Sequence, residues 1–269
     1  MTNLPQTKSI LLELKHEWLT VWLNTPENRN ALSDGLVGEL RTTFDAIRDD
    51  RSVRGVTLRG KGGVFCAGGD LKSFSAAFHG DADHQSLADT NRRGGEFFAM
   101  INEAPQTVIA LVEGAAIAGG LGLACCADVI AVTRDAKFSL TETQIGIVPA
   151  QIAPYIVHRV GLATARRLML TGARFKGDKA LSFGIADFVV DDADALTTLG
   201  DELRNDILRC APNANAITKE IVFAATRLER ATMMNFAADR FAKCLLSDEG
   251  REGISSFMEK RKPSWAPKS

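Results

Sequence analysis

A run of glycine and alanine from Val112 to Asp128, VEGAAIAGGLGLACCAD, is where this sequence can do chemistry with its backbone. Glycine lacks a Cβ atom, so Gly119 and its glycine neighbours let another group approach the main chain closely. A helix that begins near Gly119 leaves its first N–H groups unpaired, with the positive end of the helix dipole behind them. The run therefore predicts a site for an anion or an oxyanion.

Two structural alternatives compete with this interpretation. The apolar stretch between Glu113 and Asp128 is shorter than the ~18 to 20 residues that a bilayer requires, which argues against a transmembrane helix. A buried helix packed tightly against a sheet explains the same residues without any ligand. The run alone leaves the choice between this packed helix and an oxyanion site open.

A second loop favours the oxyanion site. Val64–Lys72, VFCAGGDLK, again places bare backbone just before a possible helix start. Two backbone donors that converge on one carbonyl oxygen stabilise an enolate or a tetrahedral oxyanion, and each can contribute roughly 2.7–4 kcal/mol in the transition state. The two loops together predict such a pair of donors.

The composition is that of an ordinary globular protein of 269 residues, with 45% hydrophobic and 24% charged residues. A net charge of −1 gives no overall attraction to nucleic acid or to an anionic membrane, so neither is expected as a partner. The five cysteines form no CxxC pair, which argues against a disulfide framework, a zinc site or another metal centre. With no signal-peptide core in MTNLPQTKSI, we expect a cytoplasmic protein.

The elements that position these loops can be predicted from hydrophobic periodicity. Ile10–Leu14 and Leu19–Leu23 indicate a β-hairpin, and Ser33 is a suitable N-cap for an amphipathic helix that ends near Arg48. Gly55–Leu58 reads as a buried strand that leads into the loop Gly60–Gly69. This is the first strand, glycine-rich loop and helix in succession.

The same pattern then repeats. A helix at about Leu87–Asn102 precedes the strand Thr107–Val112 and the glycine-rich run, and Asp128–Val132 and Lys137–Ser139 are further strands. The segment Phe78–Gln85 between the two units lacks periodicity and is expected to be a mobile surface loop. Two such units in succession predict an α/β core whose ligand site lies at the strand ends.

From about Ala193 onward no further strand is predicted. Residues 193–210, 212–227, 231–246 and 248–260 read as four helices, with Gly250 and Gly253 as weak points in the last. They suggest a smaller helical lobe that could contact another subunit.

Several motifs together resemble the enoyl-CoA hydratase/isomerase, or crotonase, superfamily over nearly the whole chain. The matching stretches are Asn24–Leu32 (NTPENRNAL), Val64–Lys72, Gly114–Asp128, Phe138–Pro149 (FSLTETQIGIVP) and Gly253–Pro263 (GISSFMEKRKP). The resemblance implies a crotonase (ClpP-like) fold, an α/β spiral of ββα units with a C-terminal helical lobe. It places the spiral core at 1–195 and a lobe for oligomerisation and coenzyme A covering at 196–269.

The resemblance also implies how the substrate is held, with no cofactor beyond the coenzyme A of the substrate itself. Proteins of this family bind the thioester carbonyl between two backbone N–H groups, which fall on Gly69 and Gly119. The positions that match the family's substrate contacts are Arg29, Ala31, Ala67, Asp70, Leu71, Lys72 and Gly122 in the core, and Phe241, Phe257 and Lys260 in the lobe. For Lys72 and Lys260 a solvated surface position is an equal alternative to a phosphate contact.

The acids decide the reaction. Hydratases of the family commonly use two glutamates; here the first position falls on Gly122, and only the second, Glu142, is kept. The resemblance makes Glu142 the catalytic acid and base. A single carboxylate beside a polarised thioester suits both hydration of a 2,3-double bond and the proton transfer of a Δ3,Δ2-enoyl-CoA isomerase.

Ile147–Val160, IVPAQIAPYIVHRV, resembles a segment of bacterial hydratases of 3-methylglutaconyl-CoA-like and isohexenylglutaconyl-CoA-like substrates, which also carry glycine at the first acid position. We therefore expect an enoyl-CoA hydratase for a branched acyl chain, assembled as a homotrimer or a dimer of trimers. The isomerase and a non-catalytic acyl-CoA-binding protein are the alternatives. Gln151, Tyr155 and His158 are candidates for polar contacts, with a packed helix face as the alternative for at least two of them.

Overall fold

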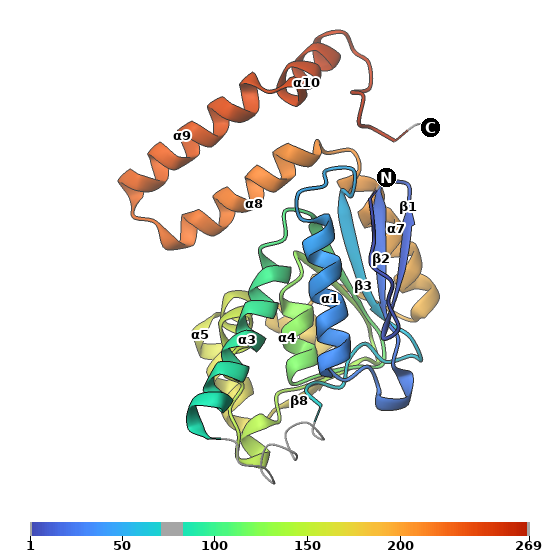
Figure 1. Cartoon of the computed structure of the whole chain (residues 1–269), viewed down its shortest axis with the longest axis vertical. Coiled ribbons are helices and arrows are strands. Elements are labelled where there is room, and N and C mark those ends of the chain that lie inside the picture. Colours follow the sequence, from blue (N-terminus) through green and yellow to red (C-terminus); the bar gives the residue numbers. More distant parts are fainter. Residues whose placement is uncertain (1, 71–82, 268–269) are drawn as a thin grey trace.

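Six strands form the central sheet of the computed structural model, which describes residues 2–70 and 83–267 (Figure 1). Their order is β1-β2-β3-β4-β6-β9, and β1 runs antiparallel to β2 while the other neighbours are parallel. The strands are β1 (Ile10–Lys15), β2 (Trp18–Leu23), β3 (Gly55–Gly60), β4 (Thr107–Val112), β6 (Val129–Thr133) and β9 (Phe188–Val190). The predicted hairpin and α/β core are confirmed.

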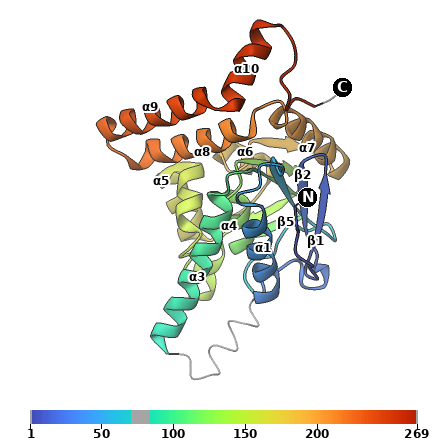
Figure 2. The ribbon, with the colours of Figure 1, turned by 45° about the horizontal axis from the view of Figure 1, so that its top comes forward.

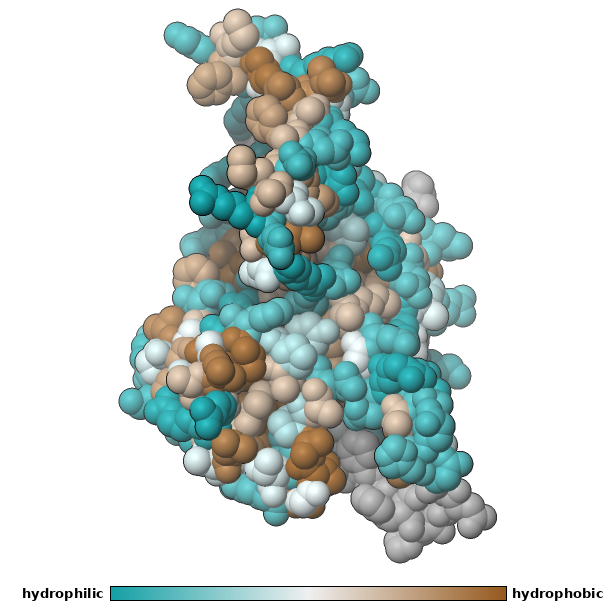
Figure 3. All heavy atoms as spheres, turned by 90° about the vertical axis from the view of Figure 1, so that its left-hand side faces the viewer, coloured by the Kyte–Doolittle hydropathy of each residue, from teal (hydrophilic) through white to brown (hydrophobic). Residues whose placement is uncertain are grey.

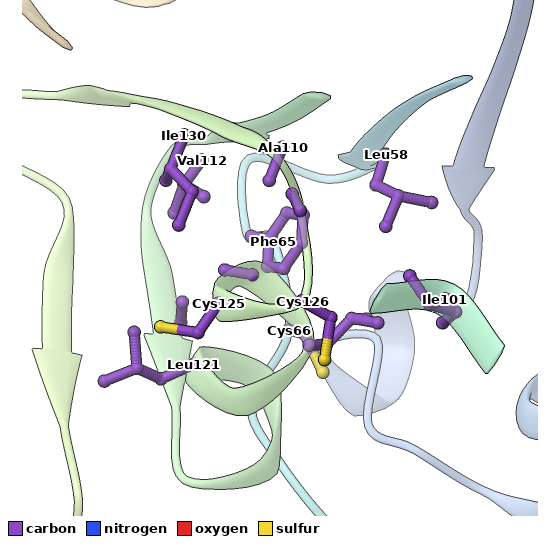
Figure 4. Close-up of a cluster of buried hydrophobic side chains, with 14 of the residues drawn as sticks. Leu58, Phe65, Cys66, Ile101, Ala110, Val112, Leu121, Cys125, Cys126 and Ile130 are labelled. Carbon is purple, nitrogen blue, oxygen red and sulfur yellow. The ribbon is translucent and has the colours of Figure 1, made fainter. Parts of the chain in front are cut away.

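One face of the sheet carries the larger core. Successive side chains of a strand point to opposite faces, so Val108, Ala110 and Val112 of β4 share this face. It is covered by α1 (Asp34–Ile47), α3 (His84–Asn102) and α4 (Gly119–Cys125). Figure 4 shows Phe65 from the loop after β3 in the same cluster as Cys125, the last residue of α4, and Cys126, which follows it.

The opposite face is covered by α7 (Ala193–Ile207), whose Leu196 packs with Ile109 and Leu111 of β4 and with Trp18 of β2. Both faces of β4 are therefore buried, as expected for a parallel strand between helices. The predicted domain boundary between residues 195 and 196 falls inside α7.

The starts of two helices follow their capping residues. The Ser33 side chain accepts a hydrogen bond from the Leu36 N–H, as its assignment as the N-cap of α1 predicts. Asp83 caps α3 by accepting the Ser86 N–H at 2.8 Å. Helix α3 consequently begins at His84, so the predicted start near Leu87 and the predicted extension of the loop Phe78–Gln85 into residues 84–85 are wrong; residues 78–82 lie outside the described part.

A second, small sheet lies beside the first. It consists of β5 (Ala115–Ile117), β7 (Lys137–Ser139) and β8 (Arg174–Lys176), in the order β5-β7-β8. Two further helices follow in this part of the chain, α5 (Ala153–Thr171), which Gly161 interrupts with φ 72° and ψ 162°, and α6 (Gly177–Phe183). The pairing of β5 with β7 places the residues after Ser139 next to the start of α4.

The last three helices project from the body as a lobe (Figure 2). They are α8 (Pro212–Arg227), α9 (Arg230–Leu246) and α10 (Asp248–Met258), which together with α7 confirm the four predicted helices. Gly253 is not a weak point but makes room for the Trp265 indole, because a methyl group there would lie 3.1 Å from the ring.

One buried and one half-buried cation attach this lobe to the body. The Arg54 guanidinium donates to the carbonyl oxygens of Leu208, Cys210 and Trp265 at 2.6–2.7 Å. Lys219 of α8 pairs with Asp128 at 2.7 Å, and the same carboxylate oxygen accepts the Val108 N–H of β4. Charge-assisted hydrogen bonds of this kind are stronger than neutral ones, so they fix the position of α8 relative to the sheet.

Large apolar side chains remain exposed on the lobe. Figure 3 shows brown side chains on the projecting part at the top of the view. None of the described residues of α9 is buried, and Phe241 on this helix is 65% exposed. Among the described helices, none is both long and apolar enough to span a bilayer.

Candidate active site

Three loops meet where the two glycine-rich motifs come together. Cys66 forms a bridge to Ala116, through its N–H to the Ala115 carbonyl and its carbonyl to the Ile117 N–H, each at 3.0 Å. The Leu32 N–H donates to the Gly68 carbonyl at 2.8 Å, which joins the loop before α1 to the same junction. These contacts are made by the backbone, so they place main-chain groups of three loops side by side.

The Gly69 and Gly119 nitrogens lie close together at this junction. A methyl group on Gly119 would be 3.5 Å from the Gly69 nitrogen. Within the described residues neither N–H donates a hydrogen bond to the protein, and both glycines are half-buried. A carbonyl oxygen between them could accept from both.

Ala118, the residue before Gly119, has an unusual backbone conformation. Its φ of 50° and ψ of −122° turn the chain sharply just before α4. The turn is held on both sides, because the Ala118 N–H donates to Ser139 and its carbonyl accepts from Leu121 and Gly122 at 3.0 Å. Gly120 must be glycine here, since a methyl group would lie 2.3 Å from the Cys66 carbonyl oxygen.

Glu142 follows β7, the strand of the small sheet that pairs with β5. Ile117 pairs with Ser139 in the β5–β7 register, and Glu142 begins the short 3-10 helix that follows (Glu142–Ile145). The residue is 8% exposed, and its Oε2 atom has no hydrogen-bond partner within the described part. Burial raises the pKa of this carboxyl, although a hydrogen bond from its own N–H opposes the shift. Such a group is a better proton acceptor than an exposed glutamate.

Gly122 lies one turn into α4, and Ile152 fills the space in front of it. A methyl group on Gly122 would lie 2.1 Å from Ile152 Cγ2 and 2.6 Å from its Cβ. The space where a side chain at this position would start is therefore occupied by an aliphatic group. Of the two acid positions implied by the resemblance, the structure holds a carboxylate only at Glu142.

The predicted coenzyme A contacts fall into three groups. Arg29, Ala31 and Ala67 lie at the junction, where the Ala67 N–H donates to the Arg29 carbonyl at 3.0 Å. Asp70 is the last residue of the first described segment, residues 2–70. The predictions for Leu71 and Lys72 lie outside the described residues.

The lobe residues are not brought to this junction. Phe241 and Phe257 are 65% and 85% exposed on α9 and α10, and Lys260 is exposed just beyond α10. In Figures 1 and 2 α9 lies on the far side of α8 from α4, the helix that begins at Gly119. A single chain therefore does not cover its own glycine loops with these side chains.

Sequence reasoning missed Asn30, whose side chain hydrogen-bonds to the loop before α1 and to the loop after β3. It is fully buried, its amide donates to the Lys61 and Val64 carbonyls at 2.9 and 2.7 Å, and its carbonyl oxygen accepts the Thr25 N–H at 2.8 Å. Its position inside the NTPENRNAL motif was the available signal. The partners, about 31 to 34 residues away, were not apparent from it.

The polar candidates around Ile152 have different roles. Gln151 donates to Asn91 of α3 at 2.7 Å, and its amide lies against Gly95. Tyr155 packs against Phe98 with ring centroids 6.1 Å apart, and burial raises its pKa to about 12. His158 is exposed. Only Gln151 makes a polar contact between elements.

Comparisons with known proteins agree with this geometry. The family model described as enoyl-CoA hydratase/isomerase matches residues 14–268. A Bacillus subtilis protein named "Probable enoyl-CoA hydratase" is 31% identical over 237 residues, which cover 88% of this chain and 90% of that protein.

Solved structures match over almost the whole chain. Pseudomonas aeruginosa AtuE superposes with a TM-score of 0.94 at 47% identity, covering 97% of this chain and 100% of the other. An enoyl-CoA hydratase/isomerase from Marinobacter aquaeolei gives a TM-score of 0.93 at 38% identity, covering 96% and 99%.

Proposed function

Because the chain belongs to the enoyl-CoA hydratase/isomerase family, and is an enzyme with the crotonase fold, we propose that it hydrates the 2,3-double bond of a branched enoyl-CoA thioester. The observation that carries the proposal is the junction itself. Two unpaired backbone donors, Gly69 and Gly119, lie close together there. A buried carboxylate, Glu142, follows three residues after Ser139, whose carbonyl accepts the Ala118 N–H, and its Oε2 atom has no partner within the described chain.

The reaction follows from these three groups. The thioester oxygen accepts hydrogen bonds from the Gly69 and Gly119 N–H groups, which makes C3 of the conjugated double bond electrophilic. Glu142 removes a proton from water as the water oxygen bonds to C3, and the electron pair of the double bond moves onto the thioester oxygen as an enolate. The protonated Glu142 then returns a proton to C2. The sum is the addition of one water molecule.

Glu142 serves both proton transfers because no second acid stands at Gly122. The raised pKa favours this double role, since a carboxyl that gains a proton more readily is closer to the balance between base and acid. The aliphatic surface of Ile152 beside Gly122 supports an apolar branch on the acyl chain.

The missing acid also supports a second candidate, a Δ3,Δ2-enoyl-CoA isomerase. There Glu142 removes a proton from C2 of a 3-enoyl thioester and returns it to C4, with the same enolate held by Gly69 and Gly119. Neither reaction requires a metal or a cofactor beyond the coenzyme A of the substrate. Activity should therefore survive exhaustive dialysis against EDTA.

Product analysis separates the candidates. The purified protein is mixed with a 2-enoyl-CoA, a 3-enoyl-CoA and 3-methylglutaconyl-CoA, and products are identified by mass spectrometry. A gain of one water on the 2-enoyl substrates supports hydration, whereas an unchanged mass with a shifted double bond supports the isomerase.

The Glu142→Gln variant tests the assigned base. Loss of the group should lower kcat by about 10²–10⁴-fold. The control is Glu13→Gln, which removes a surface carboxylate that pairs only with exposed Lys15. Full turnover by Glu142→Gln would refute the assignment, and binding without turnover by the wild type would identify an acyl-CoA-binding protein.

We further propose a homotrimer or a dimer of trimers in the cytoplasm. The exposed Phe241 and Phe257 lie too far from their own chain's junction to cover it, so a neighbouring copy is the partner that fits. All five cysteines are free, which fits a reducing compartment. Analytical ultracentrifugation tests the assembly; a monomer at micromolar concentration would contradict it.

A further inference from the structure

One aliphatic side chain packs against α4 just beyond the oxyanion donors. Gly122 follows Gly119 by three residues in α4, about 4.5 Å along the helix axis and on the same face. A thioester whose carbonyl is held by the Gly119 N–H would place the start of its acyl chain near this turn of α4. The side chain that packs against Gly122 is Ile152.

Ile152 fills this space without room for another atom. A methyl group on Gly122 would lie 2.1 Å from its Cγ2, 2.6 Å from its Cβ and 3.6 Å from its Cδ1. Ile152 is only 4% exposed and belongs to the main hydrophobic core. The Ile152 surface is therefore dry and aliphatic, and offers no hydrogen-bond partner to a polar substituent.

The packing of Ile152 against Gly122 is supported by hydrogen bonds between α5 and the residues that follow α4. The Arg159 guanidinium of α5 donates to the carbonyl oxygens of Ala127 and Asp128, just after α4, at 2.7 and 3.1 Å. Ile152 caps the start of α5, and its carbonyl accepts the Ile156 N–H at 3.2 Å. Ile152 has little freedom to move away from Gly122.

We propose that Ile152 is the residue that determines acyl specificity: it packs against an alkyl branch at C3 of the thioester. The inference rests on the proposed function for the location of the acyl chain. It assigns the substrate class as thioesters with an aliphatic substituent toward the α4–α5 contact. A carboxylate or hydroxyl against Ile152 is disfavoured, because this aliphatic side chain cannot replace the lost hydrogen bonds to water.

Binding of saturated acyl-CoAs tests the inference independently of turnover. The dissociation constants of butanoyl-CoA and 3-methylbutanoyl-CoA are measured by isothermal titration calorimetry for the wild type and for Ile152→Ala. The ratio of the linear to the branched constant should fall about fourfold in the variant, which is the fold-change for one methyl group that loses ~0.8 kcal/mol of burial.

Ile156→Ala is the matched control, because Ile156 is also fully buried on α5 but lies one turn farther from Gly122. It should leave the ratio unchanged. Should Ile152→Ala not fold, Ile152→Val lowers the ratio in the same direction by less. A ratio equal to or above the wild-type value in the folded Ile152 variant overturns the inference.

The outcome is separate from that of the proposed function. A wild type that binds both thioesters but hydrates no 2-enoyl-CoA refutes the hydratase and leaves the specificity result standing. Equal loss of affinity for both thioesters in the Ile152 variant refutes the specificity role alone. Failure of the wild type to bind either thioester refutes both.

Discussion

Substitution of Gly119 by alanine tests the oxyanion hole without removing any side chain. The new methyl group would lie 3.5 Å from the Gly69 nitrogen, 3.9 Å from the Gly68 carbonyl carbon and 3.2 Å from Leu32 Cδ1. The closest neighbour is the end of a flexible side chain, which can move by a few tenths of an ångström. The backbone of Gly119 is also compatible with alanine, because its φ is not positive.

The expected effect on activity is large. A carbonyl oxygen must lie about 2.7–3.1 Å from both donors to be stabilised. A methyl group beside the Gly69 nitrogen occupies that space and pushes the oxygen away from at least one donor. Loss of one such donor costs about 10²–10³-fold in kcat, or roughly 2.7–4 kcal/mol of transition-state stabilisation.

The expected effect on stability is small and of either sign. Alanine lowers the conformational entropy of the unfolded chain, which stabilises by about 0.4–1 kcal/mol, and the contact with Leu32 offsets part of this. For a chain of this size, 1 kcal/mol corresponds to about 2–4 °C. The melting temperature should therefore change by less than about 4 °C.

The assay follows the loss of the conjugated enoyl thioester, with thermal denaturation measured on the same preparation. Gly38→Ala is the matched control, since Gly38 lies on α1 with no atom within 4 Å of the added methyl group. It should keep the wild-type kcat. A Gly119→Ala variant with a kcat within threefold of the wild type would refute the oxyanion assignment. A large loss of stability would refute the steric argument.

Three further predictions follow from buried polar groups. The rate should fall on the acid side at a pH above the usual glutamate range, because burial raises the pKa of Glu142 and only its carboxylate is a base. The same shift means that the folded protein loses stability as pH rises through this pKa, so Glu142→Gln should melt at or above the wild type at pH 7. That difference should shrink toward about pH 4, where the unfolded carboxyl is also protonated; a variant less stable than the wild type at pH 7 contradicts this. Asn30→Ala leaves two buried carbonyls and one N–H without their partner. It should lower stability by about 3 kcal/mol, or roughly 6–12 °C in a calorimetric scan, and a loss below 2 °C would contradict its structural role. A thiol reagent should modify only two cysteines before unfolding, because three are buried and burial raises their pKa values; reaction of all five in the folded state would contradict the core. The two accessible cysteines are Cys210 and Cys244, and the three buried ones are Cys66, Cys125 and Cys126.

Strong local patterns made much of the fold predictable. Alternating apolar residues marked the hairpin, and helical spacing after Ser33 marked α1. The unbroken apolar run at Thr107–Val112 gave β4 to the residue. In contrast β5, β8 and β9 have three residues each, which is too short for any period to show.

The start of α3 was misplaced for a related reason. Its first turn carries exposed His84 and Gln85, so no apolar residue signals it, and the Asp83 cap was the only sign. A helix that begins outside the core offers little hydrophobic pattern to detect.

The candidate site divides in the same way. Gly69, Gly119 and Glu142 could be proposed from the sequence because they stand in motifs with a local signature, and their roles stay predictions. Ile152 and Asn30 were missed because their roles depend on contacts that join residues 30 or more positions apart. Such contacts leave no mark in the spacing of residues.

The positive φ of Ala118 costs free energy when the protein folds, and not when a substrate binds. A non-glycine residue in this conformation costs about 1–3 kcal/mol, and hydrogen bonds on both sides keep it there in the folded chain. That cost, and the entropy of fixing the Gly119 N–H, are met once, when the protein folds. Each substrate molecule then encounters a donor that is already immobile, so no ordering of this turn subtracts from binding.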